Sequence, residues 1–300
     1  MMKNRKSIIT TIIVSIIILI TVVVGLQIND KQKTKLIQLS ANTSRQMMGY
    51  VLKTNTGKII VIDGGTTGDT DNLVRILKQN GGKVDMWFLT HAHDDHAGAF
   101  TQIANNDEIK IEKVCASLNE KEWYEEYEPA RAEFSKTLIE TVNSERFKDK
   151  AISPALNDKM EIDNIKIEIL GIRNPEITEN PGNEQSMVIK FDTGKTTLLI
   201  LGDTGEKSSA KLLQNQKEKL KSDIVQMSHH GQAGATKELY EVVSPRICLW
   251  PTPEWLWNND NGGGKGSGTW KTLETRSWME SMGVKKNYIE KDGDIEIKFD

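Results

Sequence analysis

The 300-residue sequence has few cysteines and no excess of basic over acidic residues. It has two cysteines, Cys115 and Cys248, which cannot form a disulfide framework and are too far apart for a metal-binding motif. We expect two small buried thiols, and a single disulfide formed outside the cell is the alternative. Basic and acidic residues number 39 and 42, so no overall basic field favours nucleic acid, although this count does not address a local basic patch.

Charge is also missing from a long stretch near the N-terminus. Lys3, Arg5 and Lys6 precede an apolar run, residues 7–26, whose polar members are only Ser and Thr. A run of about twenty such residues is long enough to cross a bilayer, and basic residues before it favour a cytoplasmic N-terminus. The alternative is a cleaved signal peptide, but no A-x-A cleavage site is clear. The expected organisation is a cytoplasmic N-terminus (1–6), a transmembrane anchor or uncleaved signal (7–26), a linker (27–35) and one catalytic domain (36–300). The protein is then a single-pass membrane protein with this domain outside the cytoplasm, or a secreted one if the segment is cleaved.

Strands and helices alternate through the rest of the chain. Short apolar runs bounded by turn residues predict strands, and three-to-four-residue periodicity predicts helices. The strands are expected at 35–40, 49–54, 58–63, 84–90, 109–116, 166–170, 187–192, 196–201, 223–227, 286–290 and 294–299, and the helices at 71–79, 119–147, 206–220 and 270–282. This mixture favours an α/β fold in which two sheets pack together with helices outside. The Gly-rich segment 258–268 is expected to be a mobile loop.

All five histidines lie in two clusters, and each cluster follows an apolar strand. Three fall between His91 and His96, and the other two are adjacent at His229 and His230. Histidines with structural roles would be scattered, so this clustering favours a functional site. In H-x-H-x-D-H spacing, alternate residues of a loop point to one side, and the helix that follows returns Asp95 and His96. Imidazoles and a carboxylate suit zinc, with manganese or iron as alternatives, and this many ligands indicates two divalent ions.

These motifs resemble those of the metallo-β-lactamase superfamily, and the resemblance extends from about Leu36 to Phe299. The motifs that carry it are His91, His93, Asp95 and His96; Asp63 before Gly64 and Gly65; Asp203 after an apolar strand; and His229, His230 and Gly231. Four motifs in the same order make a chance match improbable. The resemblance implies a four-layer αββα sandwich.

The resemblance also implies a set of metal ligands. These are His91, His93 and Asp203 for one ion, and Asp95, His96, Asp203 and one of His229 and His230 for the other. Asp63 is expected to orient a metal ligand by accepting a hydrogen bond. Many members have a further histidine before the bridging aspartate, but this sequence has none between His96 and Asp203. The first ion would then be open to water, substrate or an unusual ligand, which argues against a typical lactamase.

The implied chemistry is hydrolysis by a hydroxide held between two cations, which attacks phosphorus or a carbonyl carbon. The catalytic residues predicted are Asp203, which bridges the ions, Asp95, which orients the hydroxide, and His230. The segment around Asn183 and Ser186 is similar to the hydrolase domain of bacterial competence DNA-uptake channels. It also resembles phosphorylcholine esterases that act on cell-wall teichoic acid.

Both of these relatives cleave phosphate diesters outside the membrane. The leading hypothesis is therefore an extracytoplasmic phosphodiesterase that acts on a small or polymeric substrate, either nucleic acid or cell envelope. The alternatives are a hydrolase of a lactam, lactone or thioester, and a non-catalytic metal-binding surface protein. No obligate protein partner is evident.

The region after the second histidine cluster is rich in tryptophan. Five of the seven tryptophans fall between Trp250 and Trp278. They can stack on bases or sugars or hold a choline group, and the alternative is that Trp250 and others pack in the core. Lys265 can meet phosphate but is more simply a solvated loop residue. The acidic segment 122–134 would repel a polyanion if it lined the cleft.

Overall fold

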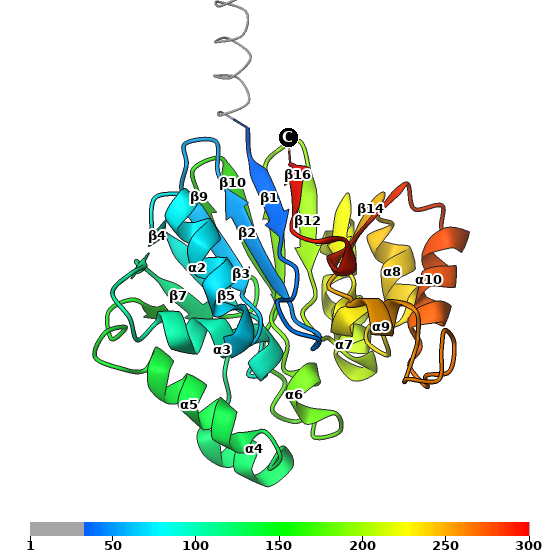
Figure 1. Ribbon diagram of the computed structural model, residues 1–300, viewed down its shortest axis with the longest axis horizontal. Helices are drawn as coiled ribbons and strands as arrows, with labels where there is room; N and C mark the ends of the chain where they lie inside the picture. The colour runs from blue at the N-terminus through cyan, green and yellow to red at the C-terminus, as the bar shows by residue number, and fades with distance from the viewer. Residues whose placement is uncertain (1–32, 300) are drawn as a thin grey trace, which may run out of the picture.

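The computed structural model describes residues 33–299, which fold around two sheets packed face to face (Figure 1). The first sheet has seven strands in the order β16-β1-β2-β3-β5-β7-β8. Its strands are β1 (Lys35–Gln38), β2 (Gly49–Lys53), β3 (Ile59–Asp63), β5 (Met86–Leu89), β7 (Val114–Ala116), β8 (Ala151–Ile152) and β16 (Ile295–Lys298). Strands β3, β5, β7 and β8 run parallel to one another.

The second sheet also has seven strands, in the order β15-β14-β13-β12-β11-β10-β9. Its strands are β9 (Lys159–Ile162), β10 (Ile165–Gly171), β11 (Val188–Asp192), β12 (Thr197–Ile200), β13 (Ile224–Gln226), β14 (Ile247–Trp250) and β15 (Lys286–Ile289). Strands β12 to β15 are parallel. A small separate sheet joins β4 (Lys83–Val84) to β6 (Lys110–Ile111).

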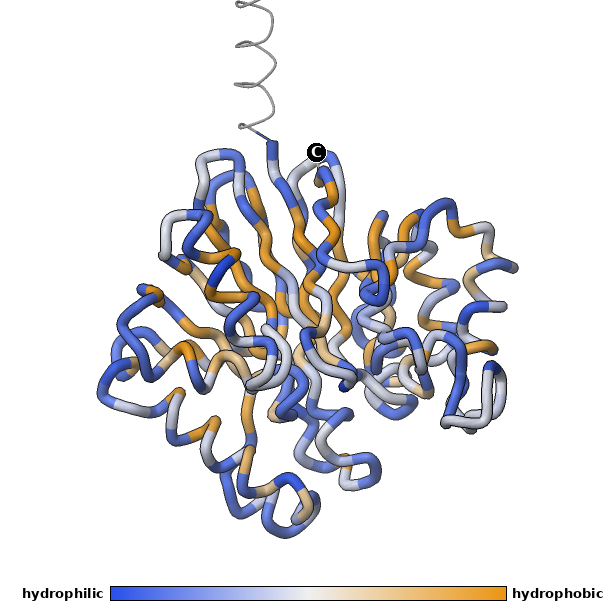
Figure 2. Tube along the Cα trace, viewed as in Figure 1, coloured by the Kyte–Doolittle hydropathy of each residue, from blue (hydrophilic) through white to orange (hydrophobic). Residues whose placement is uncertain are grey.

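Alternating side chains of the central strands build the layers. In β3, Ile60 and Ile62 point into the core between the sheets, whereas Ile59 and Val61 point to the helices on the outer face. Successive side chains of a strand lie on opposite faces, so a strand covered on both sides reads as a continuous apolar run. Figure 2 shows this apolar interior along the strands of both sheets.

Helices cover the outer face of each sheet, which makes the four layers of an αββα sandwich. The helices are α2 (Thr70–Gln79), α3 (Asp94–Ile103), α4 (Lys121–Tyr127), α5 (Ala132–Val142), α6 (Pro181–Glu184), α7 (Glu206–Leu220), α8 (Lys237–Val243), α9 (Glu254–Trp257) and α10 (Thr272–Ser281). Helices α2, α3 and α5 pack on the first sheet, and α7, α8 and α10 pack on the second. The predicted sandwich is confirmed.

The region predicted to be helical over 119–147 contains two helices and not one continuous helix. Helix α4 ends at Tyr127, Glu128 adopts a non-helical conformation, and α5 begins at Ala132. Pro129 follows Glu128, and a proline both lacks an amide proton and disfavours helical conformation in the residue before it. The predicted strand over 109–116 likewise divides into β6 and β7, which belong to different sheets.

The cysteines are both buried and free, as the sequence predicted. The predicted segments 1–6 and 7–26, and most of the linker, lie outside the described residues. Within residues 33–299, none of the helices is both long and apolar enough to cross a membrane.

The loops that carry the predicted site follow the carboxyl ends of two pairs of parallel strands. These pairs are β3 and β5 in the first sheet, and β12 and β13 in the second. In open α/β sheets this is the end at which ligands bind. The described chain starts beside its own C-terminal strand, where the Phe299 amide donates to the Thr34 carbonyl at 3.0 Å. In Figure 1 these ends of the chain lie at the opposite side of the sheets from α4 and α6.

Candidate metal centre

Two clusters of ligand-type atoms meet between the two sheets. One contains His91, His96 and Asp203, and the other contains Asp95, His96 and His230, with the ligand atoms of each cluster within 4.8 Å of one another. All five side chains are buried. A metal ion bound at about 2.0–2.3 Å joins atoms separated by such distances after small side-chain shifts.

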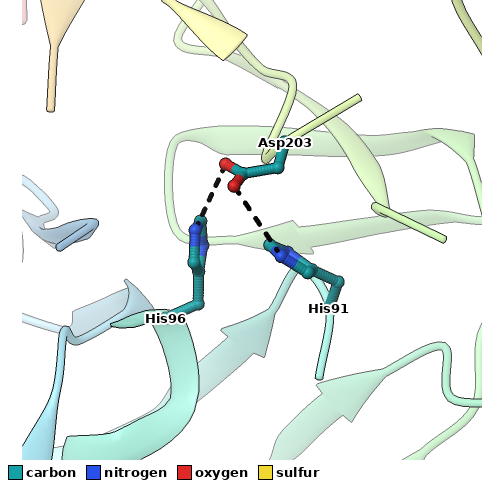
Figure 3. A group of neighbouring side chains, drawn as sticks. All are labelled: His91, His96 and Asp203. Atoms are coloured by element: carbon teal, nitrogen blue, oxygen red, sulfur yellow. Dashed lines mark ion pairs between the residues drawn. The ribbon is translucent and has the colours of Figure 1, made fainter. Parts of the chain in front are cut away.

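Asp203 lies at the centre of these side chains. Its Oδ1 is 3.2 Å from His96 Nε2, and its Oδ2 is 3.9 Å from His91 Nε2 (Figure 3). The same Oδ2 is 3.6 Å from His230 Nε2. His96 belongs to both clusters, but one imidazole nitrogen has one lone pair and binds one ion. Asp203 offers two oxygens to different histidines, so it is the residue that can contact two ions.

Asp63 holds two of these histidines in a defined tautomer. Its Oδ2 accepts from His96 Nδ1 and from Thr90 Oγ1, both at 2.7 Å, and its Oδ1 accepts from the Thr90 amide at 2.7 Å. Because the Thr90 hydroxyl proton goes to Asp63, its oxygen accepts from His91 Nδ1 at 3.1 Å. Both histidines therefore carry the proton on Nδ1 and present Nε2 to the centre. The hydrogen bond predicted for Asp63 is present, with His96 as its donor.

The adjacent histidines of the second cluster point to different places. His229 and His230 both have left-handed backbone conformations, with φ of 50° and 55°. Such conformations cost about 1–3 kcal/mol each in residues other than glycine and concentrate at functional sites. His230 Nδ1 donates to the Pro251 carbonyl at 2.8 Å, which leaves Nε2 facing the centre. His229 Nδ1 donates to the Ala233 carbonyl at 3.0 Å, and its Nε2 lies 3.4 Å from Asn183 Nδ2, at the edge of the site.

The buried carboxylates are ionised at neutral pH. Burial alone raises the pKa of Asp95, but a hydrogen bond from His230 and the charge of His96 lower it well below its usual value. The pKa of Asp203 is also raised by burial and then lowered well below its usual value by His96 and His230. Two negative charges therefore lie in a buried site, which favours cations.

The histidines respond to these charges in different ways. Burial, together with the charges of His96 and His93, holds the pKa of His91 well below its usual value, so its Nε2 lone pair is available at neutral pH. Burial also lowers the pKa of His96, but Asp203 and Asp63 outweigh it and raise that pKa well above its usual value. A divalent ion would replace this proton, so ion binding should release protons.

Unpaired buried atoms test whether metal ions fit this donor set. His91 Nε2 and Asp95 Oδ1 are buried and have no hydrogen-bond partner. Buried polar atoms are nearly always paired, so two unpaired atoms at one place indicate a ligand. Imidazole nitrogens and carboxylate oxygens are donors for zinc, manganese or iron, so the donor set fits these ions.

His93, which the sequence assigns to the first ion, lies outside both clusters. Its Nε2 is 2.8 Å from Oε1 of Glu128, the residue that follows α4. The sequence analysis did not identify Glu128 or Gln46, whose Nε2 donates to Asp95 Oδ2 at 3.0 Å. Glu128 belongs to the acidic segment noted above, but no spacing relates either residue to the histidines.

Comparison with known proteins gives a family for most of the sandwich. A family model described as the metallo-beta-lactamase superfamily matches residues 48–243. ComE operon protein 3 of Bacillus subtilis (strain 168) is 25% identical over 182 residues, which cover 59% of this chain and 21% of that protein. The match therefore spans about a fifth of the relative's length.

Solved structures of the same fold are similar over most of the chain. The metallo-beta-lactamase fold protein YhfI from Bacillus subtilis has a TM-score of 0.52 at 11% identity, covering 88% of this chain and 99% of its own. Yeast PDE1 has a TM-score of 0.51 at 11% identity, covering 86% and 97%. CmlA, a diiron beta-hydroxylase from Streptomyces venezuelae, has a TM-score of 0.53 at 8% identity, covering 89% and 54%. At these sequence identities the likeness concerns the fold alone. One of the proteins that share this fold, CmlA, is a hydroxylase. With the family model matching residues 48–243, the chain belongs to the metallo-beta-lactamase superfamily.

Proposed function

We propose that this protein is a metal-dependent phosphodiesterase that uses two divalent ions, with zinc as the first candidate. The observation that carries the proposal is the convergence of His91, His96 and His230 on Asp203, with His91 Nε2 buried and unpaired. Two ions bound there would lower the pKa of a water molecule, so that it acts as a nucleophile near neutral pH.

The chain's own residues would hold and orient the reactants. Asp203 would bind both ions, and His91 and His230 would bind one each through Nε2. Asp95 Oδ2 is 3.3 Å from His230 Nε2, and Gln46 donates to the same oxygen. Since that oxygen is engaged, the unpaired Oδ1 is the atom through which Asp95 would orient the nucleophile.

The substrate proposed is a phosphodiester, because the segment around Asn183 resembles hydrolases that cleave phosphate diesters outside the membrane. His229 and Asn183 lie beside the ion-binding side chains without belonging to either cluster. Asn183 Oδ1 is buried and unpaired. These two side chains are the candidates for contact with the substrate.

The aromatic region offers a second support for substrate binding. Trp250 is buried and packs on Trp257 with ring centroids 5.2 Å apart, so it belongs to the core. Trp255 and Trp270 pack edge to face with ring centroids 5.0 Å apart, and both are partly exposed. Trp255 Nε1 donates to the Ser44 carbonyl at 2.9 Å, on the segment that leads to Gln46. This pair is therefore a candidate wall for a sugar, base or choline group.

Acidic residues near the site favour a short substrate over a long nucleic acid. Helix α4 carries Glu122, Glu125 and Glu126, all exposed, and Glu128, which follows the helix, lies beside His93. Exposed negative charges on this helix would repel a polyanion. The substrate class we favour is a small or cell-envelope phosphodiester.

We further propose that residues 7–26 hold the protein at the cell membrane, with the catalytic domain outside the cytoplasm. If this segment is cleaved, the protein is secreted. In this arrangement the described chain begins at the end of the sheets remote from α4 and α6, so the site would face away from the bilayer.

The test is hydrolysis by the full-length protein, purified in detergent and supplied with zinc or manganese. The substrates are bis-p-nitrophenyl phosphate, glycerophosphocholine, single-stranded DNA, nitrocefin and a lactone. We expect turnover of the first two, and loss of that turnover in Asp95→Asn. Turnover of nitrocefin or the lactone instead would support the carbonyl-hydrolase alternative, and two bound ions without any turnover would support a non-catalytic metal-binding protein.

A further inference from the structure

His93 is held by a different nitrogen from the other histidines of the centre. His91, His96 and His230 each have Nδ1 hydrogen-bonded to a protein oxygen, which leaves Nε2 for an ion. In His93 the nitrogen that is held is Nε2, which lies 2.8 Å from Glu128 Oε1. The nitrogen that remains for an ion is therefore Nδ1.

The Glu128–His93 contact is enclosed. The side chain of His93 is 5% exposed and that of Glu128 is 12% exposed. Gly182 of α6 covers the pair, because a Cβ at this position would lie 2.1 Å from His93 Nε2 and 2.5 Å from both Glu128 carboxylate oxygens. Any larger residue at Gly182 would displace one of the two side chains. Glycine at position 182 therefore leaves the space that the His93–Glu128 contact occupies.

The segment that carries Glu128 is tied to the histidine loop at two further points. Arg131 Nη1 donates to Asp94 Oδ1 at 3.2 Å, and Ser135 Oγ donates to the Ala92 carbonyl at 3.2 Å. These contacts fix the start of α5, and hence the turn before it, over the loop. Glu128 is consequently presented to His93 by an anchored backbone.

We propose that His93 joins His91 in binding one of the two ions, through Nδ1, and that Glu128 is the positioning residue for His93. Its carboxylate accepts the Nε2–H of His93, fixes the ring orientation and leaves the Nδ1 lone pair for the ion. Carboxylates that hold a ligating histidine in this way raise its basicity, and their loss typically weakens metal binding by about 10–100-fold. The proposal rests on the proposed metal-dependent function, and it assigns to the α4–α5 segment a task that Asp63 performs for His96.

The test compares Glu128→Ala with Glu128→Gln in the metal-free full-length protein. Calorimetric titration with zinc measures the affinity of each variant for each of the two ions. Titration with cobalt(II) reports the coordination of the metal through its visible absorption. Glu125→Ala is the matched control, because it removes an exposed carboxylate from the same helix. We expect Glu128→Ala to weaken one of the two ions by about 10–100-fold and to leave the other unchanged. Glu128→Gln keeps an oxygen that accepts from Nε2–H, so we expect it to retain most of the affinity and the wild-type cobalt spectrum.

Unchanged zinc affinity in Glu128→Ala would overturn the proposal. An equal loss in both variants, with an altered cobalt spectrum in Glu128→Gln, would also overturn it, because Glu128 would then be a metal ligand itself. Failure of the proposed function has a different signature. In that case the wild-type protein binds no ions, which removes both proposals, or it binds two ions but hydrolyses no phosphodiester, which leaves the role of Glu128 intact.

Discussion

Replacing Asp203 with asparagine removes a negative charge from the centre of the site and keeps the size of the side chain. The carboxylate oxygens lie 3.2–3.9 Å from the Nε2 atoms of His96, His230 and His91, so an ion bound to any of these nitrogens would lie close to them. Two unit charges about 4 Å apart interact by about 4 kcal/mol at an effective dielectric constant of 20. Since about 1.4 kcal/mol corresponds to a tenfold change, we expect ion affinity to fall by roughly 10²–10³-fold.

Thermal unfolding with and without zinc measures this loss. At a free zinc concentration about 100 times the wild-type Kd, one bound ion stabilises the folded state by about 2.7 kcal/mol. For a domain of this size that corresponds to a rise in Tm of roughly 5–10 °C. Asp203→Asn at the same concentration should show a rise of about 1 °C or less.

The matched control for this experiment is Asp192→Asn, which changes an aspartate at the end of β11 that bonds only its own turn. We expect it to keep the full zinc-dependent rise in Tm. If Asp203→Asn also kept the full rise and bound two equivalents of zinc, Asp203 would not be the bridging residue and the reasoning from these distances would be wrong.

Two further predictions concern Asp63 and Glu290. Asp63→Asn should weaken zinc binding by about 10–100-fold, because Asp63 accepts through both carboxylate oxygens and asparagine has only one, so either the Thr90 amide or His96 Nδ1–H loses its acceptor. Zinc titration of the metal-free protein checks this. Affinity equal to that of the wild type would show that the tautomer of His96 does not depend on Asp63. Burial raises the pKa of Glu290 from 4.5 to about 8, so the folded state binds more protons than the unfolded state between these values, and stability falls as pH rises through this range. Urea unfolding at pH 5 and pH 9 measures this loss of stability. The loss between pH 5 and pH 9 should be smaller in Glu290→Gln than in the wild type, by an amount on the order of a few kcal/mol. An equal loss in the two proteins would contradict the raised pKa of Glu290.

The main elements of the fold could be predicted because a strand that is buried on both faces has a continuous run of apolar residues in the sequence. The residues of β3 are one such run, and the helix predicted at 206–220 matches α7. The division at Pro129 could also have been predicted from the proline. Strand β8 has only two residues, and β9 alternates between half-buried and exposed positions, so neither has a strong hydrophobic pattern.

The site was predictable where ligands are clustered along the chain, and less so where it depends on backbone conformation or distant segments. The sequence could not choose between His229 and His230, because the choice depends on two consecutive left-handed residues that turn the side chains apart. Glu128 lies 35 residues from His93, and only the folding of α4 and α5 over the histidine loop brings them together. Contacts of this kind have no local sequence pattern.

Crystals of the protein grown with zinc, with diffraction data collected on both sides of the zinc absorption edge, would locate the ions directly. We expect two anomalous peaks about 3.5–4 Å apart. One should lie beside His91 Nε2, the other beside His230 Nε2, with Asp203 between them. A single peak elsewhere on the surface, or no peak among these side chains at saturating zinc, would contradict this expectation.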